Sequence, residues 1–152
     1  MPLRTPLLAL LAGLALAATA QTPTPPQPQG RWITASGNLE VEIAPCGAAL
    51  CGTVTQVLAS HSMSREGDEM KPADGRPALG MQLLTGFVQQ PGDGPALWEG
   101  EIYNRENGKT YRCRMSMGEH GELVLRPYVG LPLFGKTQLW QRPSVPPAQP
   151  RS

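Results

Sequence analysis

The sequence predicts an all-β protein, folded as a small antiparallel barrel of about eight strands that is closed or nearly closed. Beyond residue 20, no apolar period of 3.6 residues persists through three helical turns. Short runs in which apolar and polar residues alternate recur instead, and Gly, Asn and Pro separate them. Such strands are joined mostly by hairpins, and closing the resulting ribbon into an up-and-down barrel removes its exposed edges.

The first twenty residues have the pattern of a secretory signal peptide. One basic residue, Arg4, precedes an apolar run over residues 7–18, and Ala18-Thr19-Ala20 offers the small residues that signal peptidase requires. We therefore expect cleavage between Ala20 and Gln21 and a periplasmic or secreted product. The apolar run is shorter than the about 20 residues that span a membrane, and no other long one follows, so no membrane span is expected.

Composition and charge define the domain and restrict its partners. Prolines crowd into residues 23–28 and 143–150, which indicates a linker at residues 21–29 and a disordered tail at residues 143–152. Residues 30–142 then form one domain, which is large enough to bury a core. Without the signal, twelve basic residues balance twelve acidic ones and no charge run occurs, so no nucleic-acid partner is expected.

A first hairpin is predicted over residues 39–58, with its turn at Pro45-Cys46-Gly47. If Cys46 faces Cys51 across this turn, apolar side chains share one face of the ribbon and polar ones share the other. The pairs in this register are Ile43 with Val54, Leu39 with Leu58, and Glu42 with Thr55. In an oxidising compartment Cys46 and Cys51 should form a structural disulfide, because their spacing is not the Cys-x-x-Cys of redox-active pairs.

A second hairpin is predicted around Asn107-Gly108, a dipeptide typical of a two-residue type I′ turn. Pairing outward from this turn separates an inner apolar face from an outer charged face. The inner pairs are Ile102 with Cys113, Gly100 with Met115 and Trp98 with Met117, and the outer pairs are Glu101 with Arg114 and Tyr103 with Arg112. Cys113 has no partner left and is expected to be a buried free thiol.

Further strands are predicted at residues 31–34, 81–88, 123–129 and 136–142. Trp32 opens the first of these strands, and Trp140 and Arg142 close the last, so the Arg142 side chain should lie across Trp32 where the barrel closes. Pro127 lacks an N–H, so its strand should be an edge strand or be interrupted there.

A set of short motifs runs through the domain. In chain order they are Gly30-x-Trp32, Pro45-Cys46-Gly47 with Leu50-Cys51-Gly52, Arg76-Pro77-x-Leu79-Gly80, Gly100-x-Ile102-Tyr103 with Asn107-Gly108-Lys109-Thr110-Tyr111, and Leu131-x-Leu133-Phe134-Gly135 with Gln138-x-Trp140-x-Arg142. Together they resemble a family of bacterial secreted proteins, domain of unknown function 2147, over residues 30–142. The resemblance implies a small lipocalin-like β-barrel in the periplasm. It implies no activity and no catalytic residues.

Two sets of residues could support catalysis or metal binding instead. Glu99 and Glu101 would project from one strand face roughly 7 Å apart, a separation that overlaps those of glycosidases, but pairing with Arg114 across the hairpin explains them fully. His61, Met63 and Met70, with Met115 and Met117 beside Cys113, are soft ligands that would suit Cu(I), although methionine also fills irregular core gaps. We therefore predict no enzyme, no metal and no cofactor.

The remaining observations favour a binding protein. Residues 59–76 form the longest segment without periodicity and should cover or border one mouth of the barrel. The inner face expected to meet a ligand is apolar and consists of Met81, Leu83, Ile102, Cys113, Met115 and Leu125. If the barrel is hollow, this face suits a small hydrophobic molecule or a cell-envelope component. If side chains fill the barrel, its outer surface and long loop would instead engage another envelope protein.

Overall fold

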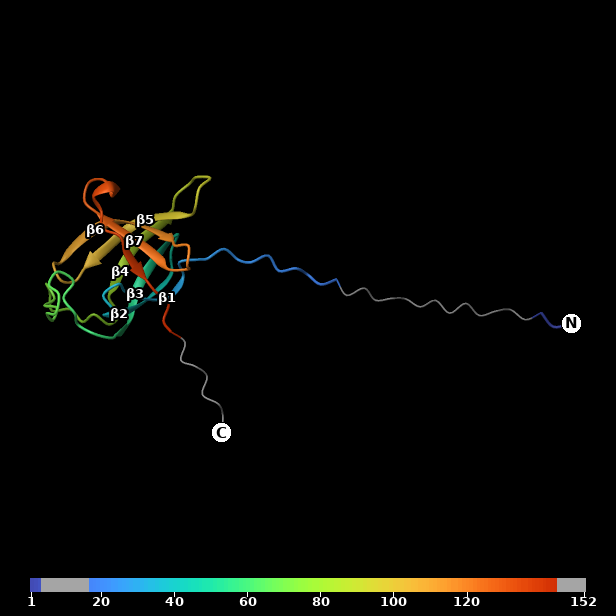
Figure 1. Ribbon diagram of the computed structural model, residues 1–152, viewed down its shortest axis with the longest axis horizontal. Helices are drawn as coiled ribbons and strands as arrows, with labels where there is room; N and C mark the ends of the chain where they lie inside the picture. Colours follow the sequence, from blue (N-terminus) through green and yellow to red (C-terminus); the bar gives the residue numbers. More distant parts are fainter. Residues whose placement is uncertain (4–16, 145–152) are drawn as a thin grey trace, which may run out of the picture.

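The computed structural model describes residues 1–3 and 17–144. Its elements are β1 (Gly30–Ile33), β2 (Leu39–Cys46), β3 (Ala49–Val57), β4 (Gln82–Gln89), β5 (Leu97–Asn104), β6 (Lys109–Met117), β7 (Leu123–Tyr128), the 3₁₀-helix η1 (Pro132–Phe134) and β8 (Gln138–Trp140). Each strand pairs antiparallel with the next in sequence, which confirms the predicted all-β arrangement (Figure 1). Most of the expected signal peptide and most of the expected tail lie outside the described residues.

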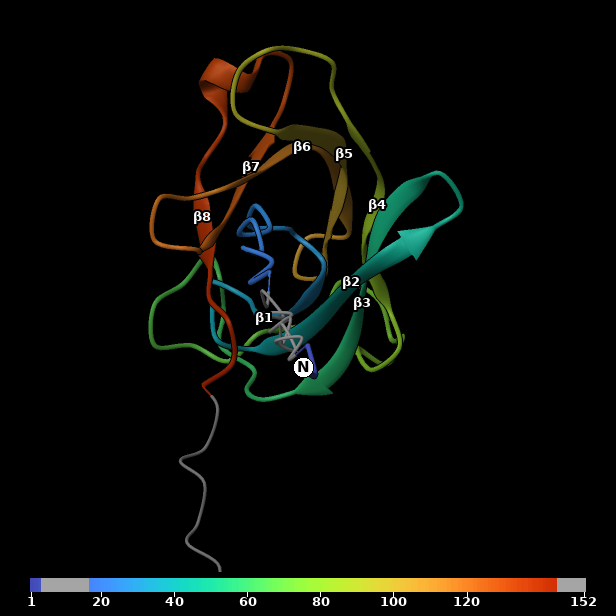
Figure 2. The same ribbon diagram turned by 90° about the vertical axis from the view of Figure 1, so that its right-hand side faces the viewer.

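The first and last strands meet and close the ring (Figure 2). The Ile33 amide donates to the Gln141 carbonyl at 2.7 Å, and the Gln141 amide donates back to the Ile33 carbonyl at 3.2 Å. Beside this bridge, the guanidinium carbon of Arg142 lies 3.7 Å from the ring centroid of the buried Trp32, as predicted. The Arg142 guanidinium also donates to three backbone carbonyls of residues 27–31, so it fastens the incoming chain to the closing strand.

Inward-facing residues of all eight strands form one apolar core. Three of the predicted inner-face residues, Cys113, Met115 and Leu125, are fully buried in it. Cys113 is a free cysteine, as expected, and burial raises the pKa of its thiol to about 12. Within the described residues, no helix is both long and apolar enough to cross a membrane.

Cys46 and Cys51 form the predicted disulfide, but the predicted register of their hairpin is wrong by two residues. Cys46 lies opposite Ala49, and Cys51 lies opposite Ala44, so the disulfide joins diagonal neighbours whose Cα atoms are 5.8 Å apart. Gly47 has a φ of 64°, which permits a two-residue turn, tighter than the loop that facing cysteines would require. The predicted pairs Ile43 with Val54, Leu39 with Leu58, and Glu42 with Thr55 are therefore replaced by pairs such as Val41 with Val54.

The second hairpin is also displaced by two residues, because its turn is longer than predicted. Asn104 pairs with Lys109, so residues 105–108 form a four-residue loop. The side-chain oxygen of Asn104 accepts hydrogen bonds from the amides of Glu106 and Asn107, and only Gly108 has a positive φ, which excludes a type I′ turn. The observed inner pairs are Trp98 with Met115, Gly100 with Cys113 and Ile102 with Tyr111, and the outer pairs are Glu99 with Arg114 and Glu101 with Arg112.

Pro127 lies where one of the two neighbouring ladders stops. β7 pairs with β6 on one side and with β8 on the other, so it is not an edge strand. Its ladder with β6 continues to Tyr128, whereas its ladder with β8 ends at Leu125, before Pro127. The missing N–H of Pro127 therefore interrupts no β7–β8 pairing. Beyond that point the chain leaves the barrel wall and makes the loop that carries η1.

Candidate ligand-binding cavity

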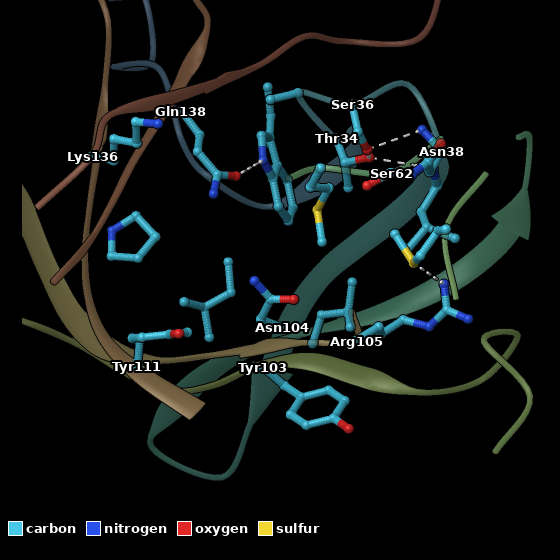
Figure 3. Close-up of a pocket in the computed structure, with 18 of the residues that line it drawn as sticks. Thr34, Ser36, Asn38, Ser62, Tyr103, Asn104, Arg105, Tyr111, Lys136 and Gln138 are labelled. Atoms are coloured by element: carbon cyan, nitrogen blue, oxygen red, sulfur yellow. Dashed lines mark hydrogen bonds between the residues drawn. The ribbon is translucent and has the colours of Figure 1, made fainter. Parts of the chain in front are cut away.

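A cavity of about 750 Å³ opens at one end of the barrel. It lies where β1, β5 and β7 end and where β2, β6 and β8 follow, and the segment between β3 and β4 borders it (Figure 3). The described residues that line it are Thr34, Ala35, Ser36, Asn38, Leu39, His61, Ser62, Met63, Met70, Leu83, Ile102, Tyr103, Asn104, Arg105, Tyr111, Pro127, Tyr128, Val129, Phe134, Lys136, Gln138 and Trp140. The barrel is thus hollow at this end rather than filled throughout.

Exposure separates the lining into a deep part and an outer part. Met70, Leu83, Ile102 and Trp140 are between 2 and 8 % exposed and form what we call the cavity floor. The outer part includes Phe134 at 75 % exposure, on the loop after β7. An apolar floor under an open entrance favours ligands that bury hydrocarbon and keep one end near water.

A buried asparagine holds the long loop, defined as residues 58–81 between β3 and β4, against the barrel. Asn38 is 2 % exposed, and its side-chain amide donates to the carbonyl of His61 while its side-chain oxygen accepts from the amide of His61, both at 2.8 Å. The pair imitates one step of a β-ladder between the start of β2 and the loop. The loop therefore has a fixed position at the entrance, and the prediction that residues 59–76 border one mouth is confirmed.

Two further contacts attach the long loop to the hairpin of β5 and β6. The carboxylate of Glu106 accepts hydrogen bonds from the Ser62 and Ser64 hydroxyls and from the Met63 amide, and the Ser62 bond above all lowers the pKa of Glu106. Nearer β4, Asp74 binds the Arg76 guanidinium at 2.9 Å and accepts from the Tyr103 hydroxyl at 2.7 Å. Arg76 contributes most to the lowered pKa of Asp74, and Tyr103 contributes next.

The charged side chains that line the cavity are all basic. Among the described residues that line it there is no Asp or Glu, whereas Arg105, Lys136 and His61 are present. The carboxylates of Glu106 and Asp74 lie behind this lining, where they bind Ser62, Met63 and Tyr103. Lys136 is exposed, and Figure 3 places it across the cavity from Arg105. Basic side chains on a low-dielectric wall attract anions.

The structure divides the six residues predicted to contact a ligand. Leu83 and Ile102 line the cavity floor, whereas Cys113, Met115 and Leu125 lie in the filled core, and Met81 packs against that core without lining the cavity. Sequence reasoning missed Asn38 and Arg105, and it placed Tyr103 on the outer face only. Tyr103 borders the cavity because strand alternation ends near the mouth, where the long loop covers the outer face.

The side chains considered for catalysis and for metal binding make other contacts in the structure. Glu99 binds Arg114 at 2.9 Å and lies 4.0 Å from Arg112, so this carboxylate is occupied by cross-strand ion pairs. His61, Met63 and Met70 do line one cavity, but the Met70 sulfur faces the Arg105 guanidinium at 3.9 Å, which opposes a cation there. Within the described residues, no group of three or more His, Cys, Asp or Glu side chains could hold a metal ion.

A closed eight-stranded up-and-down barrel with a cavity at one mouth defines a lipocalin-like protein. A solved protein of the human pathogen Helicobacter pylori, described as belonging to the lipocalin family, has the same fold with a TM-score of 0.54 and 20 % sequence identity, over 78 % of this chain and 84 % of that one. The chain belongs to the family of uncharacterized proteins conserved in bacteria, DUF2147, whose model matches residues 30–142. A search among curated proteins gives no match.

Proposed function

We propose that the protein binds a small, largely apolar molecule in the cavity at the mouth of its barrel and does so in the periplasm. The observation that carries this proposal is the cavity of about 750 Å³ above an apolar floor, a size within the range of roughly 300–1,000 Å³ typical of small-molecule sites. The asparagine-held long loop supports it, because a loop that is already ordered loses little conformational entropy when a ligand binds.

Blocking the cavity tests this proposal. Leu83→Trp places an indole in the floor and should abolish binding of N-phenyl-1-naphthylamine, a neutral apolar probe whose fluorescence rises on burial. Val88→Trp is the matched control, since Val88 lies on the same strand, β4, but is 49 % exposed and does not line the cavity. Leu83→Phe adds less bulk and should weaken binding partially. Equal probe binding by the wild type and all three variants would refute the cavity as the site.

The signal pattern and the disulfide support the proposed location. We propose that residues 1–20 are removed on export, that residues 21–29 act as a linker, and that the Cys46–Cys51 bond forms in the oxidising periplasm. Protein recovered from the periplasm should have the intact mass of a chain that begins at Gln21 and carries one disulfide. A cytoplasmic product that retains Met1 would contradict the proposed location.

An exposed apolar loop favours a second candidate, an interaction with another envelope protein. Val129, Leu131, Leu133 and Phe134, in the loop after β7, are each between 60 and 77 % exposed. Arg126 donates from its guanidinium to the carbonyls of Pro132 and Leu133, so the loop is held in shape. Native mass spectrometry of the periplasmic protein separates the two: a bound small molecule supports the carrier, and a defined protein partner lost on Phe134→Ser supports the interaction.

A further inference from the structure

We propose that the ligand is an amphiphile with a carboxylate head group and that Arg105 binds this carboxylate while the hydrocarbon lies on the cavity floor. The inference rests on the proposed function, because it assumes that the cavity is the binding site. It adds the chemical class of the ligand and the residue that selects it.

Arg105 has unused hydrogen-bonding capacity in the wall of the cavity. It follows β5 directly and lines the cavity, where Figure 3 labels it. Its Nε is buried and has no hydrogen-bond partner, and its Nη1 meets only the Met70 sulfur at 3.9 Å. A thioether is a weak acceptor, whereas a guanidinium offers five N–H donors in one plane. Because the buried Nε is closed to the cavity, a ligand oxygen would bind the Nη groups, where the folded chain offers only the weak thioether acceptor.

The other arginines between residues 31 and 142 are already occupied. They bind either a carboxylate, as Arg114 binds Glu99, or backbone carbonyls, as Arg126 and Arg142 do. Across the described residues, no carboxylate comes within 4.0 Å of the Arg105 guanidinium. The next residue in the chain, Glu106, turns to the long loop and is held there by three hydrogen-bond donors. Among the described residues Arg105 thus forms no ion pair, and no acid lines the cavity.

The single charge of Arg105 favours a carboxylate over a phosphate monoester. A guanidinium binds either group through two parallel hydrogen bonds in one plane, but one positive charge balances the one negative charge of a carboxylate and not the higher charge of a phosphate monoester. Lys136 lies across the cavity and is exposed, so it does not add a second charge at the same point. Leu83 and Ile102 on the floor provide apolar contacts for the hydrocarbon of such a ligand.

Calorimetric titration with dodecanoate and with dodecan-1-ol tests the inference, because the two probes share a chain and differ in charge. The wild type should bind dodecanoate about tenfold or more tightly than dodecan-1-ol, the size expected for a charged hydrogen-bonded pair. Arg105→Gln should remove this preference, leave dodecan-1-ol binding unchanged and not lower the melting temperature. Lys109→Gln, a matched loss of one positive charge outside the cavity lining, should keep the preference.

The possible outcomes separate this inference from the proposed function. If neither probe binds the wild type, the apolar cavity site itself is wrong. If both probes bind equally, or if Arg105→Gln keeps the preference for dodecanoate, the site stands and the role of Arg105 is refuted. If Lys136→Gln removes the preference and Arg105→Gln does not, the head group lies on the opposite wall. Tighter binding of dodecyl phosphate than of dodecanoate would overturn the carboxylate assignment.

Discussion

Gly100 lies where strand alternation would allow an inward side chain and where the structure leaves no room for one. It lies in the middle of β5, on the inner face opposite Cys113. A Cβ built there would be 2.7 Å from two ring carbons of Phe87 and 2.7 Å from the backbone oxygen of Thr85. Phe87 is 1 % exposed, so its ring is confined by the core and cannot swing into solvent.

These distances set the expected cost of Gly100→Ala. Carbon atoms attract most strongly about 3.5–4.0 Å apart, so the Phe87 ring or the strand must move by roughly 1 Å. Overpacking costs about 1–3 kcal/mol, and contact with a backbone oxygen and a confined ring places Gly100→Ala in the upper part of that range, at about 2–3 kcal/mol. The better strand preference of Ala returns about 0.5–1 kcal/mol. We expect a net loss of about 1–2.5 kcal/mol in the free energy of unfolding, which lowers the melting temperature by roughly 4–10 °C for a domain of this size.

Urea unfolding followed by tryptophan fluorescence measures this loss, and a double-mutant cycle assigns it to the Phe87 contact. Phe87→Leu removes the ring, so Gly100→Ala should cost at least about 0.5 kcal/mol less in that background than alone. Gly94→Ala is the control, because a Cβ at Gly94 meets nothing within 4 Å. If Gly100→Ala is as stable as Gly94→Ala, or if Phe87→Leu leaves the cost of Gly100→Ala unchanged, the packing of Phe87 on β4 against Gly100 on β5 is not the cause of the loss.

Three further predictions concern the closure, the long loop and the free thiol. Arg142→Ala removes the guanidinium that lies 3.7 Å from the Trp32 ring centroid and its hydrogen bonds to backbone carbonyls. The free energy of unfolding should therefore fall by about 1–2 kcal/mol, and Arg142→Lys should recover part of this loss. An unchanged urea midpoint would contradict the role of Arg142 in closure. Asn38→Ala removes both hydrogen bonds to the backbone of His61, so the free energy of unfolding should fall by about 1–3 kcal/mol and hydrogen exchange should accelerate in residues 58–72. Faster exchange that is confined to other segments would refute the attachment of the long loop. Burial raises the pKa of the Cys113 thiol from its ordinary value of 9.0 to about 12, so the folded protein favours the protonated thiol. The stabilising contribution of the protonated thiol is complete below pH 9 and is lost as the pH rises from 9 toward 12. The stability difference between the wild type and Cys113→Ala should decrease over that range, and a difference independent of pH would show that the thiol is not buried.

The faces of the strands were predictable from the sequence, whereas their registers were not. Trp98, Gly100 and Ile102 were placed inside and Glu99 and Glu101 outside, and the structure has them so. Both hairpins nevertheless differ from the prediction by two residues. Side chains alternate with a period of two, so a shift of two residues keeps every side chain on its face, and the alternation carries no information about such a shift.

Turn geometry decided the register, and it depends on backbone angles and local hydrogen bonds. Gly47 made the first turn shorter than expected, because its positive φ allows two residues to reverse the chain. Asn104 made the second turn longer, because its side chain binds two amides of the loop. The Asn107-Gly108 dipeptide alone did not reveal that the residue before the loop would determine the turn.

The candidate site was only partly visible in the sequence. The apolar floor includes Leu83 and Ile102, which alternation could identify, but the same pattern also selected Cys113, Met115 and Leu125, which lie in the filled core. Depth along the barrel axis separates the two groups, and period-two alternation does not encode depth. Arg105 and Asn38 lie in or next to turns, where no periodic pattern exists, and only the folded chain brings them to one cavity.

Local patterns in the chain were enough to predict the all-β class, the order of eight strands, the disulfide between Cys46 and Cys51, and the contact of Arg142 with Trp32. Each of these follows from local alternation, from cysteine spacing, or from the fact that a closed ring must join its ends. The folded chain was needed to show where the barrel is hollow, how Asn38 holds the long loop, and that no described carboxylate pairs with Arg105. A cavity and its charge depend on distances between segments far apart in the chain, and local patterns do not encode those distances.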